Sequence, residues 1–75
     1  MKEADSTQTE QRQLRRAEVL EAATTLFAGK GFAKTTVVDV AHSLGLRAPA
    51  LYYYFPSKEA LLFAVLERAM LQLNA

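Results

Sequence analysis

The stretch TVVDVAHSLGLRAPALYYYFPSK, residues 36–58, decides the fold of this chain. Over residues 37–44 its apolar side chains recur at the spacing i, i+3, i+4 and i+7, which places them on one face of a helix. Thr36 stands where a helix N-cap belongs, and Asp39 completes a variant of the capping box. Gly45 then tolerates the positive φ with which many helices end. The pattern predicts a short helix over residues 37–44.

A second short helix is predicted over residues 48–55 of the same stretch. Pro49 falls within its first turn, where the N–H that proline lacks would have no partner inside the helix. Leu51 and Phe55 are four residues apart, so both point to one side of the helix. Pro56 cannot continue the helix and closes it.

Two short helices joined by a glycine turn are typical of a helix-turn-helix, whose second helix enters the major groove of DNA. The small side chain of Ala41 leaves room for the second helix to cross the first. The predicted core of the motif consists of Val40, Ala41, Leu44, Leu46, Leu51 and Phe55. The second helix would then expose Arg47, Ala48, Pro49, Tyr52 and Tyr53. The plainer alternative is an ordinary helical bundle with a glycine turn, which has any one of these features but rarely all of them in register.

Longer helices are predicted on either side of this motif. Upstream, apolar residues recur at three- and four-residue steps over residues 12–30, and Gly31 supplies a C-terminal stop. Residues 1–11 are almost wholly polar, so they are predicted to form a disordered N-terminal arm. Downstream, Ser57 is a good N-cap for a fourth helix over residues 57–75.

The beginning of this fourth helix, ALLFAVL at residues 60–66, is apolar on every side. A helix that is apolar all round needs partners on more than one face, and the upstream helices can cover only one. We therefore expect the chain to be the N-terminal piece of a longer protein. Its DNA-binding domain would span residues 12–56, and residues 57–75 would lead to a further domain.

Composition limits the classes of function open to the chain. It has 75 residues, no cysteine and a single histidine, so the sequence predicts neither a disulfide framework nor a metal site. A membrane span needs about twenty apolar residues, far more than the longest run here, and no secretory signal is visible, so we expect a cytoplasmic protein without membrane contact. Neither paired carboxylates, a nucleophile–base pair nor a phosphate-cradling glycine loop is present, which argues against an enzyme.

The charge distribution permits a nucleic-acid partner, although the net charge of +1 alone would not suggest one. Residues 1–10 have a net charge of −2, from one basic and three acidic residues, whereas residues 30–59 have +2, from four basic and two acidic residues. A further basic cluster consists of Arg12, Arg15 and Arg16. These three arginines are possible contacts to flanking DNA, and a solvated helix face is the blander explanation for them.

Three segments of the chain carry a family resemblance: VLEAATTLFAGKGF (19–32), TTVVDVAHSLGL (35–46) and LYYYFPSKEALL (51–62). All three resemble the DNA-binding domain of the tetracycline-repressor (TetR) family, and the last is the most specific. The resemblance implies an all-α fold, with a homeodomain-like three-helix head and a fourth helix that connects it to a C-terminal domain. That domain would bind a small-molecule effector and form a homodimer. The implied function is a repressor that binds double-stranded DNA at a palindromic operator until its ligand releases it.

Individual residues of the motif have expected roles, which for the three tyrosines and Lys58 are what the resemblance implies and for Arg47, Ala48 and Pro49 follow from side-chain chemistry. Base readout is expected of Arg47, Ala48, Pro49 and Tyr53. Phosphate contacts are expected of Thr36, Tyr52, Tyr54 and Lys58. For Arg47 a phosphate contact or a solvated charge stays open, and for Thr36 a purely capping role. The tyrosines are consecutive, so at least one of them should pack inward.

Three residues of the second short helix depart from the family's usual pattern. Arg47 replaces a small hydroxyl residue, which removes a helix cap. Pro49 and Ala50 stand where glycine and a threonine or serine are common, and alanine cannot donate a hydrogen bond to phosphate. These departures predict that the protein prefers an operator sequence different from those of other family members.

A different class of function also fits the sequence. The chain would then be a helical protein-interaction module that docks a partner on its apolar fourth helix. Mutations in that helix would abolish function, and Arg47 would be dispensable.

Overall fold

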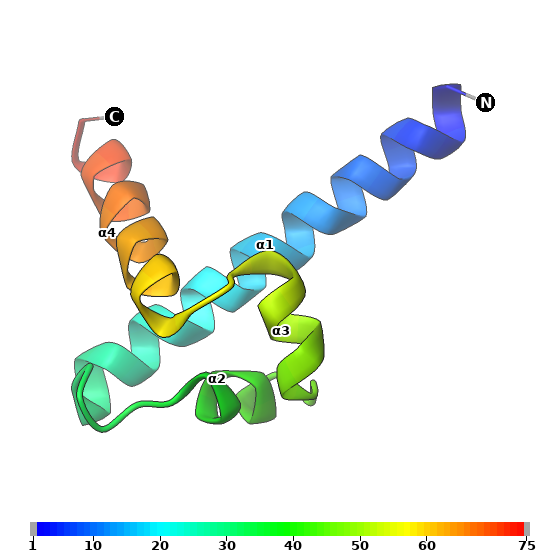
Figure 1. Ribbon diagram of the computed structural model, residues 1–75. Helices are drawn as coiled ribbons and strands as arrows, with labels where there is room; N and C mark the ends of the chain where they lie inside the picture. The colour runs from blue at the N-terminus through cyan, green and yellow to red at the C-terminus, as the bar shows by residue number, and fades with distance from the viewer. Residues whose placement is uncertain (1, 75) are drawn as a thin grey trace.

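The computed structural model describes the backbone of residues 2–74 and the side chains of residues 9–73. Over this range the fold is all-α. Helix α1 spans Lys2–Lys30, α2 spans Val37–Ser43, α3 spans Ala48–Tyr54 and α4 spans Lys58–Asn74. The short helices α2 and α3 lie together beside α1, and α4 leaves in another direction (Figure 1). The predicted fold class, a helix-turn-helix head followed by a fourth helix, is confirmed.

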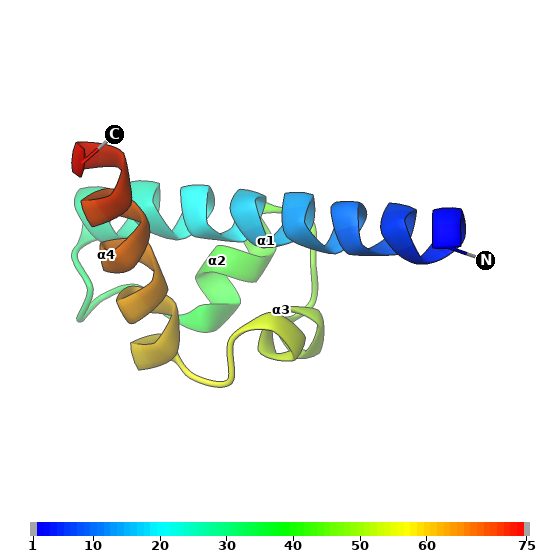
Figure 2. The same ribbon diagram turned by 90° about the horizontal axis from the view of Figure 1, so that it is seen from above.

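Helix α1 is much longer than the sequence predicted. The disordered arm predicted over residues 1–11 is wrong for the described part, because the helix begins at Lys2 rather than near Arg12; Met1 lies outside the described residues. Residues 2–11 contain no glycine or proline, and extending an existing helix is far easier than nucleating a new one. A polar segment can therefore prolong a helix that is nucleated elsewhere. Figure 2 shows this N-terminal part projecting beyond the other helices.

The turn after α2 is a Schellman arrangement. Gly45 has a φ of 70°, in the left-handed region that favours glycine. The N–H of Leu46 donates to the carbonyl of Ala41 at 2.8 Å, and the N–H of Gly45 donates to the carbonyl of His42 at 3.0 Å. These bonds satisfy carbonyls that the end of a helix leaves unpaired. Helix α2 ends at Ser43, one residue before the predicted end.

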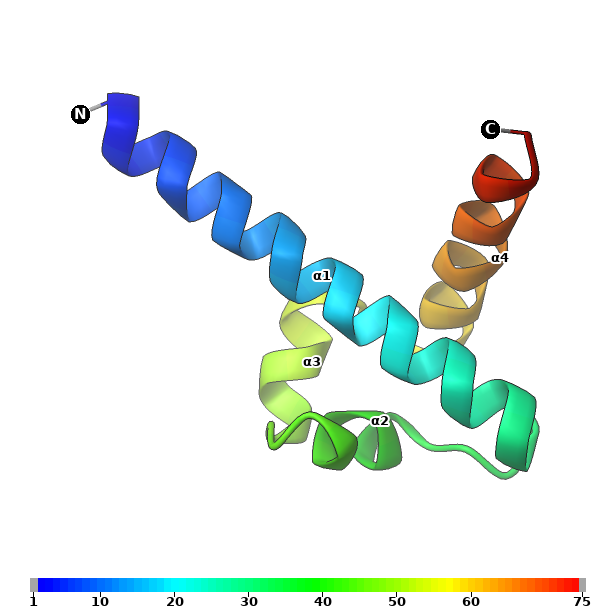
Figure 3. The same ribbon diagram turned by 180° about the vertical axis from the view of Figure 1, so that it is seen from behind.

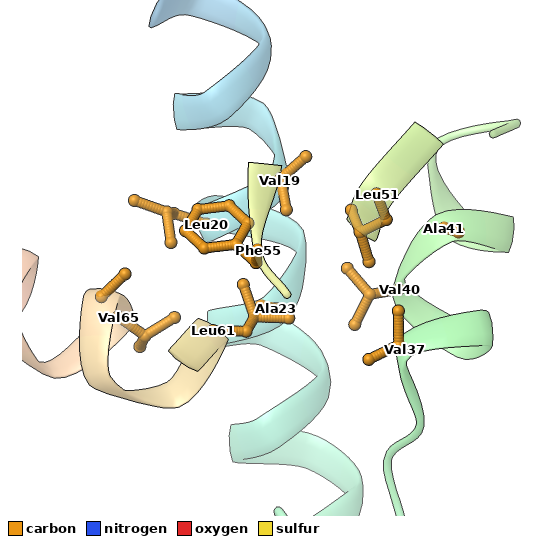
Figure 4. Close-up of a cluster of buried hydrophobic side chains, with 11 residues drawn as sticks. Val19, Leu20, Ala23, Val37, Val40, Ala41, Leu51, Phe55, Leu61 and Val65 are labelled. Atoms are coloured by element: carbon orange, nitrogen blue, oxygen red, sulfur yellow. The ribbon is translucent and has the colours of Figure 1, made fainter. Parts of the chain in front are cut away.

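The hydrophobic core is built around α1 and receives side chains from every other helix. It consists of Val19, Leu20 and Ala23 of α1, Val37, Val40 and Ala41 of α2, Leu51 of α3 with Phe55 after it, and Leu61, Ala64 and Val65 of α4. In Figure 4, the α1 residues lie between the α2 and α3 side chains and those of α4. Leu44 and Leu46 are partly buried against this core. All six residues predicted for the core of the helix-turn-helix therefore lie in it or against it.

Helix α4 packs one side on α1 and leaves an apolar surface exposed. It is capped by Ser57, whose hydroxyl oxygen accepts from the N–H of Ala60 at 3.0 Å. Its large exposed apolar side chains are Phe63, Leu66, Met70, Leu71 and Leu73. Figure 3 shows α1 and α4 diverging, with the first turns of α1 far from the last turns of α4. Within the described residues, no helix is both long and apolar enough to cross a membrane.

Candidate nucleic-acid interface

Helix α3 divides its side chains between the core and the solvent. Leu51 is fully buried, and Phe55, the C-cap residue of the helix, is nearly so. The exposed set consists of Arg47, Pro49, Ala50, Tyr52 and Tyr53. Ala48 and Tyr54 are partly exposed. A short helix with one continuous exposed face can enter a major groove without disturbing the core beneath it.

Arg47 stands at the entrance to α3 with its side chain in solvent. It is the N-cap residue, with extended backbone, and its side chain makes no capping hydrogen bond. The missing capping hydrogen bond agrees with the prediction that arginine, in place of a small hydroxyl residue, removes the helix cap. A guanidinium has only N–H donors, so it cannot cap a helix N-terminus, and these donors can meet a guanine edge or a phosphate. Helix α3 ends at Tyr54, one residue earlier than predicted.

The three consecutive tyrosines of α3 have different surroundings. Tyr53 is 66% exposed and Tyr52 is 48% exposed, whereas Tyr54 packs partly against the core. The rings of Tyr53 and Tyr54 meet edge to face, with their centroids 5.2 Å apart. Tyr53 thus stands on the exposed face of α3 beside Pro49. Tyr54 is partly buried, as expected of at least one of three consecutive tyrosines.

The N-terminus of α2 is held by a complete capping box. The N–H of Asp39 donates to the Thr36 hydroxyl oxygen at 3.0 Å, and the N–H of Thr36 donates to Oδ2 of Asp39 at 3.0 Å. The same Oδ2 accepts from Nζ of Lys30 at 3.0 Å. The Thr36 side chain is exposed, and its hydroxyl acts here as an acceptor.

These contacts make the fold acid-sensitive at one carboxylate. The hydrogen bond from the Thr36 N–H, followed by that from Lys30, lowers the pKa of Asp39 from 3.8 to about 2. A carboxylate with a depressed folded-state pKa stabilises the fold above its unfolded pKa, and this stabilisation is lost as the pH falls through the folded pKa. We expect Asp39→Asn to lower the melting temperature at pH 7, with the difference from wild type shrinking between about pH 4 and about pH 2.

Thermal unfolding followed by circular dichroism across this pH range measures the effect. Lys30→Gln should produce a smaller pH-dependent difference than Asp39→Asn, because the larger cause, the Thr36 N–H, remains in place. A difference between Asp39→Asn and wild type that stays constant down to pH 2 would contradict the assignment.

Lys58 begins α4 and joins it to the connection between α1 and α2. Its Nζ donates to the carbonyl of Phe32 at 2.8 Å and lies 4.1 Å from the centroid of the Phe32 ring. The Phe32 ring in turn meets Phe27 of α1 edge to face, at 5.3 Å. This structural contact leaves room for the expected phosphate contact of Lys58, since an ammonium group has three N–H donors.

The three arginines of α1 have three different partners. Arg12 lies over the ring of Tyr53, with its Cζ 5.6 Å from the ring centroid. Arg16 lies over the ring of Phe55 at 5.0 Å, which ties α1 to the end of α3. Arg15 pairs with Glu18 one turn along α1, at 3.2 Å. The cluster is thus not a uniform solvated face, because two of its members contact aromatic residues of the α3 region.

Two residues near this surface had no predicted role. Phe32 receives Lys58 through its carbonyl and its ring, and no local pattern signals a contact between residues so far apart in the chain. Thr35 is fully buried, and its hydroxyl donates to the carbonyl of Gly31 at 2.8 Å, so it ties the connection to the end of α1. Among the described side chains, no three histidines or carboxylates gather as metal ligands do.

Known proteins resemble the part of the chain that forms this surface. Residues 19–65 match the family model described as bacterial regulatory proteins of the tetR family. The HTH-type transcriptional repressor KstR2 of Rhodococcus jostii is 44% identical over 52 residues, which cover 69% of this chain and 26% of that protein. KstR2 of Mycolicibacterium smegmatis is 46% identical over 52 residues, with coverage of 69% and 25%. The HTH-type transcriptional regulator EthR of the same species is 42% identical over 53 residues, with coverage of 71% and 24%.

The region of similarity is only part of each relative. The chain spans about a quarter of the length of these curated relatives. No solved structure matches the chain.

Proposed function

Because this chain belongs to the tetR family of bacterial regulatory proteins and carries its DNA-binding domain, we propose that the complete protein is a transcriptional repressor that binds a palindromic operator as a homodimer. Each subunit would place α3 in a major groove of one half-site. A small-molecule effector, bound in a C-terminal domain, would release the dimer from DNA. The named relatives are regulators of transcription, which supports a binding role rather than a catalytic one.

The exposed face of α3 is the observation that carries this proposal. The exposed side chains include Arg47, Pro49, Tyr52 and Tyr53, whereas Leu51 of the same helix is fully buried. The residues proposed to read DNA are therefore separate from those that stabilise the fold. Arg47 can make a bidentate contact to guanine, and the apolar edge of Pro49 can meet a thymine methyl group. Ala48 is partly exposed and would contribute a smaller apolar contact of the same kind.

Phosphate contacts would lie on either side of this reading face. Thr36 stands at the N-terminus of α2, and Lys58 stands at the N-terminus of α4. Helix N-termini favour anions, because their first N–H groups lack partners within the helix. Tyr52 and Tyr54 would add hydroxyl donors from α3. Phosphate contacts of this kind position the domain, while the α3 side chains specify the sequence.

The apolar surface of α4 supports the proposal of a second domain. Five large apolar side chains of this helix are exposed, among them Phe63 and Leu73. A surface of this kind is normally covered in the complete protein. The same surface is what an interaction module would use, but that function leaves the exposed face of α3 without a purpose.

Substitutions at Arg47 and Lys58 should separate specificity from general affinity. We expect Arg47→Ala to lose about 1–3 kcal/mol of discrimination at one base pair of each half-site, because a bidentate arginine contact is lost. Lys58→Gln should weaken binding to operator and random DNA by a similar factor, because it removes a charge that reads no base. The measurement is operator selection from random-sequence DNA, followed by titration of each variant against the selected and a scrambled duplex.

The control for charge is Arg68→Ala, which removes one positive charge from α4. Arg68 donates to the carbonyl of Ala17 of α1 at 3.4 Å and has no proposed part in DNA binding. The sequence preference of the Arg68→Ala variant should equal that of wild type. If Arg47→Ala and Lys58→Gln changed affinity and preference alike, the proposed division of roles would be wrong, and if no sequence were enriched by the wild-type dimer, the proposed function would fail.

A further inference from the structure

One contact between the long helix α1 and the exposed face of α3 is made by Arg12. The guanidinium of Arg12 lies over the Tyr53 ring, with Cζ 5.6 Å from the centroid. Both residues are exposed, and they come from segments far apart in the chain. Figures 1 and 3 show the end of α3 next to this part of α1. The contact exists because α1 continues as a helix well before the first core residue, Val19.

We propose that Arg12 is a positioning residue for sequence readout: it holds the ring of Tyr53 in the orientation that α3 presents to DNA. This inference rests on the proposed function, since it assigns Arg12 an effect on which sequence is preferred. The effect passes through the ring of Tyr53 and does not require Arg12 to touch a base.

The surroundings of Tyr53 explain why such a residue is needed. The ring is 66% exposed, and it meets Tyr54 edge to face at 5.2 Å. It borders two open hollows between α1 and α3, one lined also by Leu14 and the other by Gln13. An aromatic side chain beside open space can swing between rotamers, and fixing it on binding has an entropic cost. A cation placed over the ring removes part of that cost before DNA arrives.

The neighbouring arginines show that this contact is specific to Arg12. Arg15, three residues along α1, pairs with Glu18, and Arg16 lies over Phe55, which is part of the buried core. Of these three arginines, Arg12 is the one that the structure places over an exposed residue of α3. A planar guanidinium stacks on an aromatic face better than a compact ammonium group does. Lysine at this position should therefore rescue the effect only in part.

A double-mutant cycle on the full-length dimer tests the proposal. The binding constants of wild type, Arg12→Ala, Tyr53→Leu and the double variant are measured on a duplex recovered from random-sequence DNA, at fixed salt. We expect Arg12→Ala to weaken binding about two- to five-fold in wild type and to have no further effect in Tyr53→Leu, as loss of an exposed cation–π contact predicts. In Tyr53→Phe, which keeps the ring, the effect of Arg12→Ala should persist, and Arg12→Lys should restore part of the affinity.

Arg15→Ala is the comparator for a direct phosphate contact. Its effect should be the same in wild type and Tyr53→Leu, because Arg15 does not touch the ring. Arg12→Ala could instead weaken binding equally in wild type and Tyr53→Leu, and also reduce the slope of log K against log salt by about 0.9 per site. Arg12 would then be a phosphate contact, and the proposal would be overturned. The proposal would be supported if Arg12→Ala lost its preference at one base position and Tyr53→Leu lost it at the same position.

A measurement without DNA separates this inference from the proposed function. In the free protein, the side-chain protons of Arg12 should show upfield ring-current shifts in NMR spectra that disappear in Tyr53→Leu and remain in Tyr53→Phe. Unshifted Arg12 resonances in wild type would overturn the inference even if the protein binds its operator. Shifted resonances in a protein that binds no DNA would instead show that the contact exists and that the proposed function fails.

Discussion

Leu51→Ala is expected to lower the free energy of unfolding by about 2–5 kcal/mol. The Leu51 side chain is fully buried where α3 meets the core, so its removal leaves a cavity beneath the reading helix. A domain this small has a modest stability reserve, and a loss of that size is enough to unfold much of it. Chemical denaturation followed by circular dichroism measures the change.

Leu14→Ala is the matched control for this substitution. It makes the same chemical change on α1, where the leucine is 66% exposed, and alanine is a good helix former. Its effect on the denaturation midpoint should be small. Equal midpoint shifts for the two variants would mean that Leu51 does not occupy the core position described above.

Raising the salt concentration from 50 to 200 mM is expected to weaken operator binding by about a thousand-fold or more. Each head offers Lys58, Arg47, Arg15 and Arg16, so a dimer would neutralise about six to eight phosphates and release their counterions. Fluorescence anisotropy titrations at a series of salt concentrations give the slope of log K against log salt.

Lys58→Gln provides the internal check on this slope. It should reduce the slope by about 0.9 for each head that contacts DNA, because one charge is lost from each. Glutamine retains an N–H donor for the carbonyl of Phe32, so the structural contact of this position is partly preserved. A binding constant that does not change with salt would exclude phosphate contacts as the basis of affinity.

Local signals in the sequence predicted most of the helix-turn-helix. Thr36 and Asp39 form the capping box that their spacing indicated, and Gly45 has the positive φ that the turn requires. The burial of Leu51 and Phe55 follows from their four-residue spacing. Each of these features depends on residues within one turn of each other, which is the range over which a sequence pattern carries structural information.

The features that were missed depend on longer distances. The length of α1 is the exception: the polarity of residues 2–11 predicts disorder, whereas continuation of a helix needs only the absence of strong breakers. The contacts of Lys58 with Phe32 and of Arg12 with Tyr53 join separate helices, so they exist only once the fold has formed. The roles of Arg47, Lys58 and Arg12 in DNA binding stay predictions, which the substitution experiments on these residues test.

The separation of faces on α3 has a consequence for how this regulator can evolve. Arg47, Pro49, Ala50 and Tyr53 are exposed, while Leu51 and Phe55 carry the packing. If the proposed roles hold, mutations on the outer face would change which sequence is read and leave the stability of the fold almost unchanged. A duplicated gene could drift toward a new operator through stable intermediates at every step. The departures at Arg47, Pro49 and Ala50 fall on this permissive surface, where divergence between paralogues has the lowest structural penalty.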